Sequence, residues 1–275
     1  MRSVGQTTPT ADCHAHIYPL GRSLYPRRSI TFSASDLIKR MDEFGVVYSG
    51  VLAHPAPAAT VEDGAREHDV MAGQIKPFAD RLVPWCWVTP RWRSAGIAEA
   101  RRCLRLGFRG VVLDPIQEDF ELDDPAVAPL CTLASDAGVP VFVETYLEHR
   151  GAEPWRLVAL AGRYPSLPFI MAHLGGIGLQ QNMTGATLAA EVPNVYLETS
   201  CTKSDPFATF EGPARILGAE RVVLGSNQPL HHVALNLRKL ELTALAEDEK
   251  DLIRGLNFLR LVGVKTRQPV GEGSV

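Results

Sequence analysis

The stretch TADCHAHIYPL, residues 10–20, combines an apolar strand pattern with two histidines near its end. The pattern predicts a strand over Ala11–Ile17. Because side chains alternate along a strand, His14 and His16 lie on one face with Asp12 one layer deeper, and Cys13 lies on the other face. Two imidazoles held side by side indicate a metal ion, provided that further ligands reach the same point.

A short apolar run followed by a helical segment recurs along the whole chain. The predicted strands are Ala11–Ile17, Val46–Ala53, Leu82–Thr89, Phe108–Asp114, Val139–Thr145, Phe169–His173, Val195–Thr199 and Val222–Gly225. Helical spacing is found over Ser35–Phe44, Gly64–Phe78, Gly96–Leu106, Pro125–Ala137, Pro154–Arg163, Leu179–Glu191 and Pro206–Leu217, and from Pro229 to about Val262 in two pieces.

This alternation predicts an α/β fold, a single-domain (β/α)8 TIM barrel. Eight βα units with short connections imply parallel strands, and about 250 residues is the typical length of such a barrel. The alternative is an open doubly wound sheet, but the sequence has no GxGxxG turn of the dinucleotide-binding kind. We expect an N-terminal arm over residues 1–9, the barrel over 10–263 and a flexible tail over 264–275.

Composition is that of an ordinary soluble globular protein, with 45% hydrophobic residues, 21% charged residues and a formal net charge of −3. This charge argues against a nucleic acid or an anionic membrane as partner, so we expect a small-molecule substrate and leave a homo-oligomer open. No signal peptide or membrane-spanning run is visible. The cysteines are odd in number, scattered and without a CxxC pair, which is typical of a reducing compartment and predicts a cytoplasmic protein: Cys13, Cys86, Cys103, Cys131 and Cys201.

Polar residues end most of the predicted strands, where a TIM barrel carries its active site. They are His14, His16, His54, Thr89, Arg91, Asp114, Glu144, His173, Glu198, Ser200 and Asn227. A lone histidine such as His54 is more often an ordinary hydrogen-bonded residue, whereas His14 and His16, joined by His173 on the same rim, indicate a metal site. Two such neighbouring imidazoles can both form zinc–nitrogen bonds of about 2.0–2.1 Å.

Other polar residues read equally well as solvated side chains. His231 and His232 open the last helical region and either cap it or contact a ligand. Arginines gather in the first and third loops, where solvation and anion binding are both open: Arg22, Arg27, Arg28, Arg91 and Arg93. We expect Arg27 and Arg91, together with Asp114, to contact the substrate.

Five segments in order resemble the amidohydrolase superfamily, in the amidohydrolase-related branch that also contains non-oxidative decarboxylases. They are DCHAH (12–16), GFRGVVLDP (107–115), PFIMAHLGG (168–176), NVYLETS (194–200) and GAERVVLGSNQP (218–229). The resemblance spans the whole chain and implies a TIM barrel with a divalent metal, most often zinc, with manganese as the alternative. It does not specify the substrate.

The resemblance also implies roles for individual residues. His14 and His16 match the first-strand metal ligands, and His173 matches a histidine that binds a second metal or the substrate. Glu144 stands where relatives usually carry a ligating histidine, and a carboxylate can take that place. Asn227 stands where relatives carry an aspartate that binds metal and accepts a proton from the attacking water, which an amide cannot do.

Three functions follow from these residues. The expectation we favour is a metal-dependent hydrolase of a small, acidic or cyclic carbonyl substrate, with a metal-activated water and with His173 and Asn227 in the catalytic site. The alternative is a non-oxidative decarboxylase, a carbon–carbon lyase, which tolerates the loss of a water-activating base. A third is a ligand-binding barrel whose catalysis is impaired because Asn227 replaces the aspartate.

Overall fold

The computed structural model describes residues 8–25, 28–52, 60–203 and 205–265. Eight parallel strands form one sheet in the order β1-β4-β5-β6-β7-β8-β9-β10. They are β1 (Thr10–His16), β4 (Val46–Leu52), β5 (Leu82–Trp87), β6 (Val111–Leu113), β7 (Val141–Val143), β8 (Phe169–Met171), β9 (Val195–Glu198) and β10 (Val222–Val223). Residues 1–7 of the arm expected over 1–9 and residues 266–275 of the tail expected over 264–275 lie outside the described residues, as do Arg27 and His54.

The chain beyond β10 closes the sheet onto β1. The backbone N–H of Cys13 donates to Leu224 O at 2.9 Å, and the N–H of His16 donates to Gln228 O at 2.7 Å. An isolated parallel bridge joins Ala15 to Gln228. The predicted TIM barrel is therefore confirmed, and its closure brings the end of the first strand beside the loop that follows the eighth.

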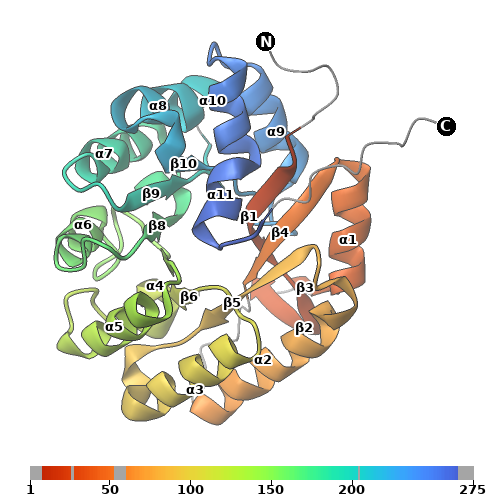
Figure 1. Ribbon diagram of the computed structural model, residues 1–275, viewed down its shortest axis with the longest axis vertical. Coiled ribbons are helices and arrows are strands. Elements are labelled where there is room, and N and C mark those ends of the chain that lie inside the picture. The colour runs from red at the N-terminus through yellow and green to blue at the C-terminus, as the bar shows by residue number, and fades with distance from the viewer. Residues whose placement is uncertain (1–7, 26–27, 53–59, 204, 266–275) are drawn as a thin grey trace.

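Helices surround the barrel, as Figure 1 shows. They are α1 (Ala34–Glu43), α2 (Val61–Ile75), α3 (Arg93–Arg105), α4 (Pro115–Glu118), α5 (Ala128–Ala137), α6 (Pro154–Gly162), α7 (Leu179–Ala189), α8 (Gly212–Leu217), α9 (Val233–Glu241), α10 (Glu247–Asp251) and α11 (Asn257–Leu261). Ser33 caps α1 in a capping box with Asp36. None of the helices in the described ranges is long and apolar enough to span a membrane.

The first loop differs from the prediction. The sequence pattern predicts no strand between Ile17 and Ser33, but the structure has an antiparallel pair there, β2 (Tyr18–Tyr25) and β3 (Arg28–Phe32), with Tyr18 opposite Phe32. The pair was not predicted because Pro19 and Gly21 are ordinary turn signals in a sequence. A β-hairpin therefore stands directly after the two histidines.

Aromatic side chains fill the barrel below the histidines. Trp85 packs on Phe142 and Phe258, with ring centroids 5.7 and 6.2 Å apart, and Phe142 meets the His14 ring edge to face at 4.8 Å. A Cβ at Gly50 or Gly110 would overlap the Trp85 indole, so these two positions require glycine. The tryptophan therefore serves the barrel core, and His14 rests on a packed floor.

Candidate metal centre

His14 and His16 converge at the end of β1. Their Nε2 atoms lie 3.0 Å apart, and the residues are 0% and 2% exposed. The His16 ring also stacks on Tyr18, the first residue of the hairpin, at 5.8 Å. Two nitrogens this close share one proton or face a common cation, so the strand brings the two rings together as the sequence pattern indicates.

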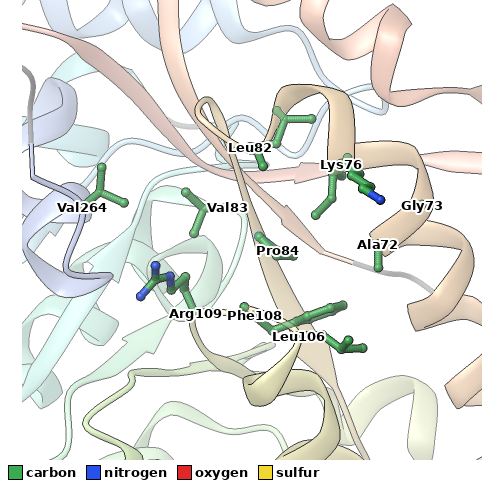
Figure 2. A pocket seen from close by; sticks show the side chains of 13 residues that line it. Ala72, Gly73, Lys76, Leu82, Val83, Pro84, Leu106, Phe108, Arg109 and Val264 are labelled. Atoms are coloured by element: carbon green, nitrogen blue, oxygen red, sulfur yellow. The ribbon is translucent and has the colours of Figure 1, made fainter.

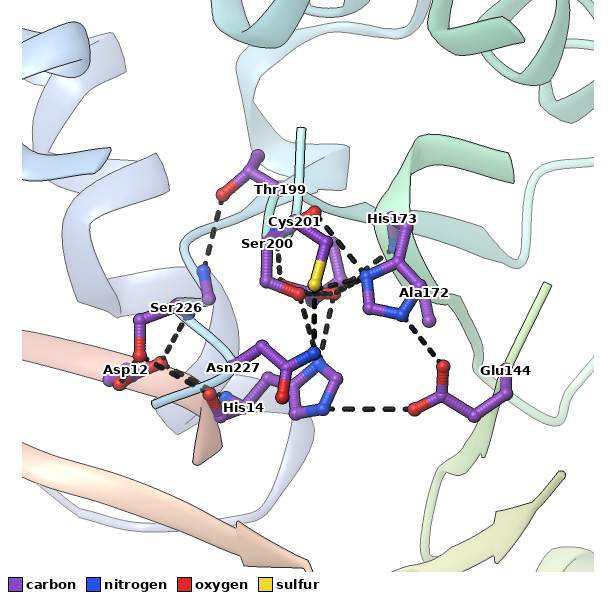
Figure 3. A network of polar contacts seen from close by, with 12 residues as sticks. Asp12, His14, Glu144, Ala172, His173, Thr199, Ser200, Cys201, Ser226 and Asn227 are labelled. Carbon is purple, nitrogen blue, oxygen red and sulfur yellow. Dashed lines mark hydrogen bonds and ion pairs between the residues drawn. The ribbon is translucent and has the colours of Figure 1, made fainter. Parts of the chain in front are cut away.

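Glu144 and His173 complete the cluster from the neighbouring strands. Glu144 follows β7, and its Oε1 lies 3.7 Å from His14 Nε2 while its Oε2 lies 2.7 Å from His173 Nε2. One ligand atom from each of His14, Glu144 and His173 falls within 4.8 Å of the others. Figure 3 shows the three side chains turned toward one another. The structure thus brings together the four residues that we predicted as metal ligands.

The HLGG segment (173–176) turns sharply to present His173. His173 and Leu174 both adopt left-handed backbone angles, with φ of 58° and 57°. Asn182 of α7 holds this turn by donating to His173 O at 3.1 Å and to Gly176 O at 2.6 Å. Such angles are costly outside glycine, so several contacts are needed to fix this turn.

Glu198, the last residue of β9, links the two histidines from behind. Its Oε2 accepts from the His173 backbone N–H at 3.2 Å and lies 3.2 Å from His14 Nδ1. A Cβ at Gly225 would overlap this carboxylate, which explains the glycine there. Burial alone would raise the pKa of Glu198, but the imidazole of His14 outweighs it and lowers that pKa.

The Glu198 contact fixes which nitrogen of His14 faces the cluster. With Nδ1–H donating to the carboxylate, Nε2 keeps its lone pair for a cation. Burial disfavours the charged ring, yet the negative charges of Glu198 and Glu144 raise the pKa of His14 overall. Ser200 adds to the support, because its Oγ lies 3.1 Å from His14 Nδ1 and 3.0 Å from His173 Nδ1. The sequence places Glu198 and Ser200 at a strand end but gives no sign of this supporting role.

Asp12 joins the first strand to the loop after β10. Its Oδ1 accepts from the backbone N–H of His14 at 3.1 Å and of Ser226 at 2.9 Å, and its Oδ2 accepts from Ser226 Oγ at 2.5 Å. Full burial raises the pKa of Asp12 to about 7. Asp12 therefore joins the first strand of the barrel to the loop after the last strand. Its carboxylate is turned to these groups and not to the histidine cluster.

Asn227 lies next to His14, where the resemblance places the relatives' aspartate. Its backbone N–H donates to His14 O at 2.7 Å, and its φ is 60°. The side-chain Nδ2 donates to Cys201 Sγ at 2.8 Å, whereas Oδ1 is buried and has no partner among the described residues. Sequence reasoning missed Cys201 as a site residue. Burial raises the pKa of this thiol, but the imidazoles of His173 and His231 lower it to about 6.

Two of the three predicted substrate residues, Asp114 and Arg91, are among the described residues. Asp114 caps α4 by accepting from Ile116 N at 2.9 Å and Gln117 N at 3.0 Å. Its burial, with the nearby charge of Glu144, raises its pKa to about 7. Arg91 is exposed and donates to Glu118 O at 3.1 Å, which ties it to the end of α4.

The residues of the cluster fit a divalent ion. Two imidazole nitrogens, a carboxylate oxygen and an unpartnered amide oxygen are donors that zinc and manganese accept, and the second nitrogen of His14 is held by a carboxylate, as is usual for a metal ligand. A second group of possible ligands, His68, Cys86 and Cys103, is different. There the His68 Nε2 accepts from the Trp87 N–H at 3.2 Å and Nδ1 lies 2.7 Å from Glu99, so both nitrogens already have partners.

Two cavities help to place the site. One of about 580 Å³ lies at the N-terminal ends of β5 and β6 and is lined by apolar side chains such as Val83 and Phe108 (Figure 2). A smaller one of about 240 Å³ reaches Cys201 and Ser226 beside α9. Because TIM-barrel chemistry occurs at the C-terminal ends of the strands, the candidate functional site is the histidine cluster and not the larger cavity.

Comparison with known proteins identifies the family and the shared fold. A family model described as Amidohydrolase matches residues 11–264. No match was found among curated protein sequences. The fold is shared with 5-carboxyvanillate decarboxylase of Sphingomonas paucimobilis, at 17% identity over 94% of this chain and 100% of that chain, with a TM-score of 0.75.

Two further structures share the barrel. One is a dihydroxybenzoic acid decarboxylase of Polaromonas with bound manganese and the inhibitor 2-nitroresorcinol, at 17% identity, 94% and 98% coverage and a TM-score of 0.76. The other, from Acinetobacter baumannii with citric acid bound, is assigned as a 2-pyrone-4,6-dicarboxylic acid hydrolase, at 16% identity, 92% and 99% coverage and a TM-score of 0.68. At these identities the likeness concerns the fold.

Proposed function

The chain belongs to the amidohydrolase family, and we propose that this member is a metal-dependent, non-oxidative decarboxylase of an aromatic or similarly conjugated carboxylic acid. The observation that carries the proposal is the pair formed by His173 Nε2 and Glu144 Oε2 at 2.7 Å, opposite an eighth-strand position that holds only the neutral amide of Asn227. The site therefore offers a proton donor but lacks the family's carboxylate base. The decarboxylases among the structural neighbours support the same choice.

His14, His16 and Glu144, the last through Oε1, are the residues that would hold the ion. A bound divalent ion supplies the positive charge that holds a substrate carboxylate in place. Zinc is the ion we expect, because two imidazoles and one carboxylate suit it well, and manganese suits the same set when water completes it.

His173 supplies the proton. Its Nδ1 lies 3.3 Å from the carbonyl oxygen of Ser200, which only accepts, so Nδ1 carries a proton. Its Nε2 faces Glu144 Oε2 at 2.7 Å, a distance that needs a second proton between the two atoms. Burial disfavours the charged ring, but the charge of Cys201, followed by that of Glu144, outweighs it and raises the pKa of His173 well above its usual value.

The reaction balances with this one proton. The bond between the carboxylate carbon and the ring carbon breaks, and its electron pair stays on the ring carbon. That carbon takes the proton from His173 Nε2, and carbon dioxide leaves. Solvent then returns a proton to His173, so the net change consumes one proton per carbon dioxide released.

Aromatic side chains next to the cluster favour a ring-bearing substrate. The Tyr146 ring lies 5.1 Å from the His173 ring, and Tyr18 stacks on His16. Tyr146 belongs to the loop after β7, and Tyr18 belongs to the segment that follows β1. A planar conjugated acid can stack there while its carboxylate faces the ion.

Hydrolysis, which we favoured from the sequence, becomes the second candidate. The observation in its favour is the Glu144 carboxylate, whose Oε1 lies near His14 Nε2 and could accept a proton from water in place of the missing aspartate. The cyclic-ester hydrolase among the structural neighbours makes lactones the compounds to test.

A parallel assay separates the two. Zinc- or manganese-loaded protein is incubated with a panel of aromatic carboxylic acids and a panel of lactones and simple esters, in D₂O, and products are identified by mass spectrometry. We expect carbon dioxide and a product with one deuterium at the vacated ring carbon. Turnover of lactones alone, or of neither panel by metal-loaded protein, contradicts the decarboxylase.

A further inference from the structure

The side chain of Asn227 is held in one orientation by Cys201. Nδ2 donates to Cys201 Sγ at 2.8 Å, and this leaves Oδ1 as the end of the amide without a partner among the described residues. Asn227 is only 8% exposed, so bulk water does not satisfy that oxygen. A buried carbonyl oxygen without a partner is costly, which points to a ligand that the oxygen is meant to bind.

Orientation matters for an amide in a way that it does not for a carboxylate. The two ends of asparagine have nearly the same shape, but only the oxygen has a lone pair for a cation. A rotation of about 180° about the last side-chain bond would present N–H groups to the ion and abolish the interaction. A neighbour that accepts a hydrogen bond is therefore needed to select the productive orientation.

The backbone places both residues for this task. The N–H of Asn227 donates to His14 O at 2.7 Å, which fixes Asn227 beside the first metal ligand. Cys201 and Asn227 both have left-handed φ values, 57° and 60°, and their side chains meet in the Nδ2–Sγ contact. Figure 3 shows the Asn227 amide joined to the Cys201 sulfur by a dashed line.

We propose that Cys201 is a positioning residue that keeps Oδ1 of Asn227 turned toward His14 and His16, so that the amide oxygen becomes a ligand of the divalent ion. The inference rests on the metal centre of the proposed function but not on which reaction it performs. Cys201 is needed to orient the side chain because position 227 holds an asparagine where relatives carry an aspartate. An aspartate there has two equivalent oxygens and would need no such neighbour.

The test is a double-mutant cycle on ion binding. Cys201→Val removes the acceptor at nearly constant volume, and Cys201→Ser retains an acceptor. Each is made in the wild-type and Asn227→Asp backgrounds, and the Kd for zinc is measured by competition with a chromophoric chelator. The visible spectrum of the cobalt-loaded protein serves as a second readout of the ligand set.

In the wild-type background we expect Cys201→Val to weaken zinc binding by about 10–100-fold, the range for outer-shell partners of a metal site. Cys201→Ser should retain most of the affinity. With Asn227→Asp, the valine substitution should change the Kd by less than about threefold, because a carboxylate has two equivalent oxygens and needs no neighbour to orient it. The two substitutions should therefore be non-additive, as is usual for residues in contact. The cobalt spectrum should change with Cys201→Val in the wild-type background and stay constant in the aspartate background.

Cys131→Val, at a buried cysteine of α5 distant from the cluster, is the matched control and should leave the Kd unchanged. An equal loss of affinity in both backgrounds would show that Cys201 acts through packing. No loss in either would show that the amide does not depend on the sulfur, and both outcomes overturn the proposal. If Cys201→Val does not fold, Cys201→Ala takes its place. Failure of the decarboxylase assay leaves the result intact, because the cycle measures binding without turnover.

Discussion

The Nε2 atom of His14 lies 3.0 Å from the Nε2 atom of His16, in a strand whose pairing with β4 shifts register between Asp12 and Ala15. They are two residues apart on one strand and thus project from the same face. Glu198 occupies the other nitrogen of His14, so the pair presents lone pairs to a single point. The proposed metal site of this protein is built on this pair of histidines.

His16→Gln should remove one ligand while keeping a side chain of similar length. We expect the zinc content of protein purified without chelator to fall by at least about tenfold, because loss of a direct ligand should exceed the effect of an outer-shell change. Elemental analysis of the purified protein measures it. His232→Asn is the control, since His232 caps α9 and its substitution keeps an acceptor there. Equal zinc content in His16→Gln and wild type would contradict the ligand assignment.

Glu198→Gln should weaken binding of the ion although Glu198 is not one of the proposed ligands. The amide still fills the space beside Gly225 but no longer carries the charge that holds the His14 Nδ1 proton. We predict a loss of about 10–100-fold in zinc affinity with little change in thermal stability. Calorimetric titration gives the affinity, and Glu191→Gln on the surface after α7 serves for comparison. A drop in stability without a drop in affinity would make Glu198 a purely structural residue.

Asn227→Asp should return the carboxylate that relatives carry at this position. We expect tighter ion binding, and hydrolysis of simple esters or lactones raised by at least about tenfold, toward the range attributed to a general base. Steady-state rates on both substrate panels measure the change. An unchanged rate of ester hydrolysis together with unchanged affinity would mean that position 227 does not face the ion.

Glu99 gives a pH dependence of stability outside the site. Burial would raise its pKa, but hydrogen bonds from His68 and Arg102 outweigh it and lower the pKa from 4.5 to about 2. A carboxylate with a depressed pKa stabilises the fold fully above its unfolded value, and this contribution is lost as the pH falls from about 4.5 toward 2. Glu99→Gln should therefore unfold at lower urea concentration than wild type at pH 7, by a difference that shrinks clearly by pH 3.5. A constant difference across that range would contradict the assignment.

The fold could be predicted because the barrel repeats one simple pattern. Each strand is a short apolar run followed by a segment with helical spacing, so eight copies identify the architecture without any knowledge of contacts. The hairpin β2–β3 was not predicted because Pro19 and Gly21, taken on their own, indicate a loop. Pairing between two such short strands depends on tertiary neighbours, which periodicity does not reveal.

The site could be predicted as far as strand ends determine it. His14, His16, Glu144 and His173 meet because parallel strands of a barrel end on one rim. The supporting roles of Glu198 and Ser200 and the Cys201–Asn227 contact depend on left-handed turns after the strands. Those turns have no clear sequence signature, since His173, Cys201 and Asn227 all adopt them without being glycine.

The most direct test of the decarboxylase is the stoichiometry of carbon dioxide released per aromatic acid consumed by metal-loaded protein, compared between wild type and His173→Gln. Glutamine keeps a donor toward Glu144 but cannot pass its proton to carbon. We predict one carbon dioxide per acid consumed for wild type. For His173→Gln we predict a rate of carbon dioxide release about 10²–10⁴-fold lower, with the ion still bound. Consumption of substrate without carbon dioxide, or full activity of His173→Gln, would contradict it.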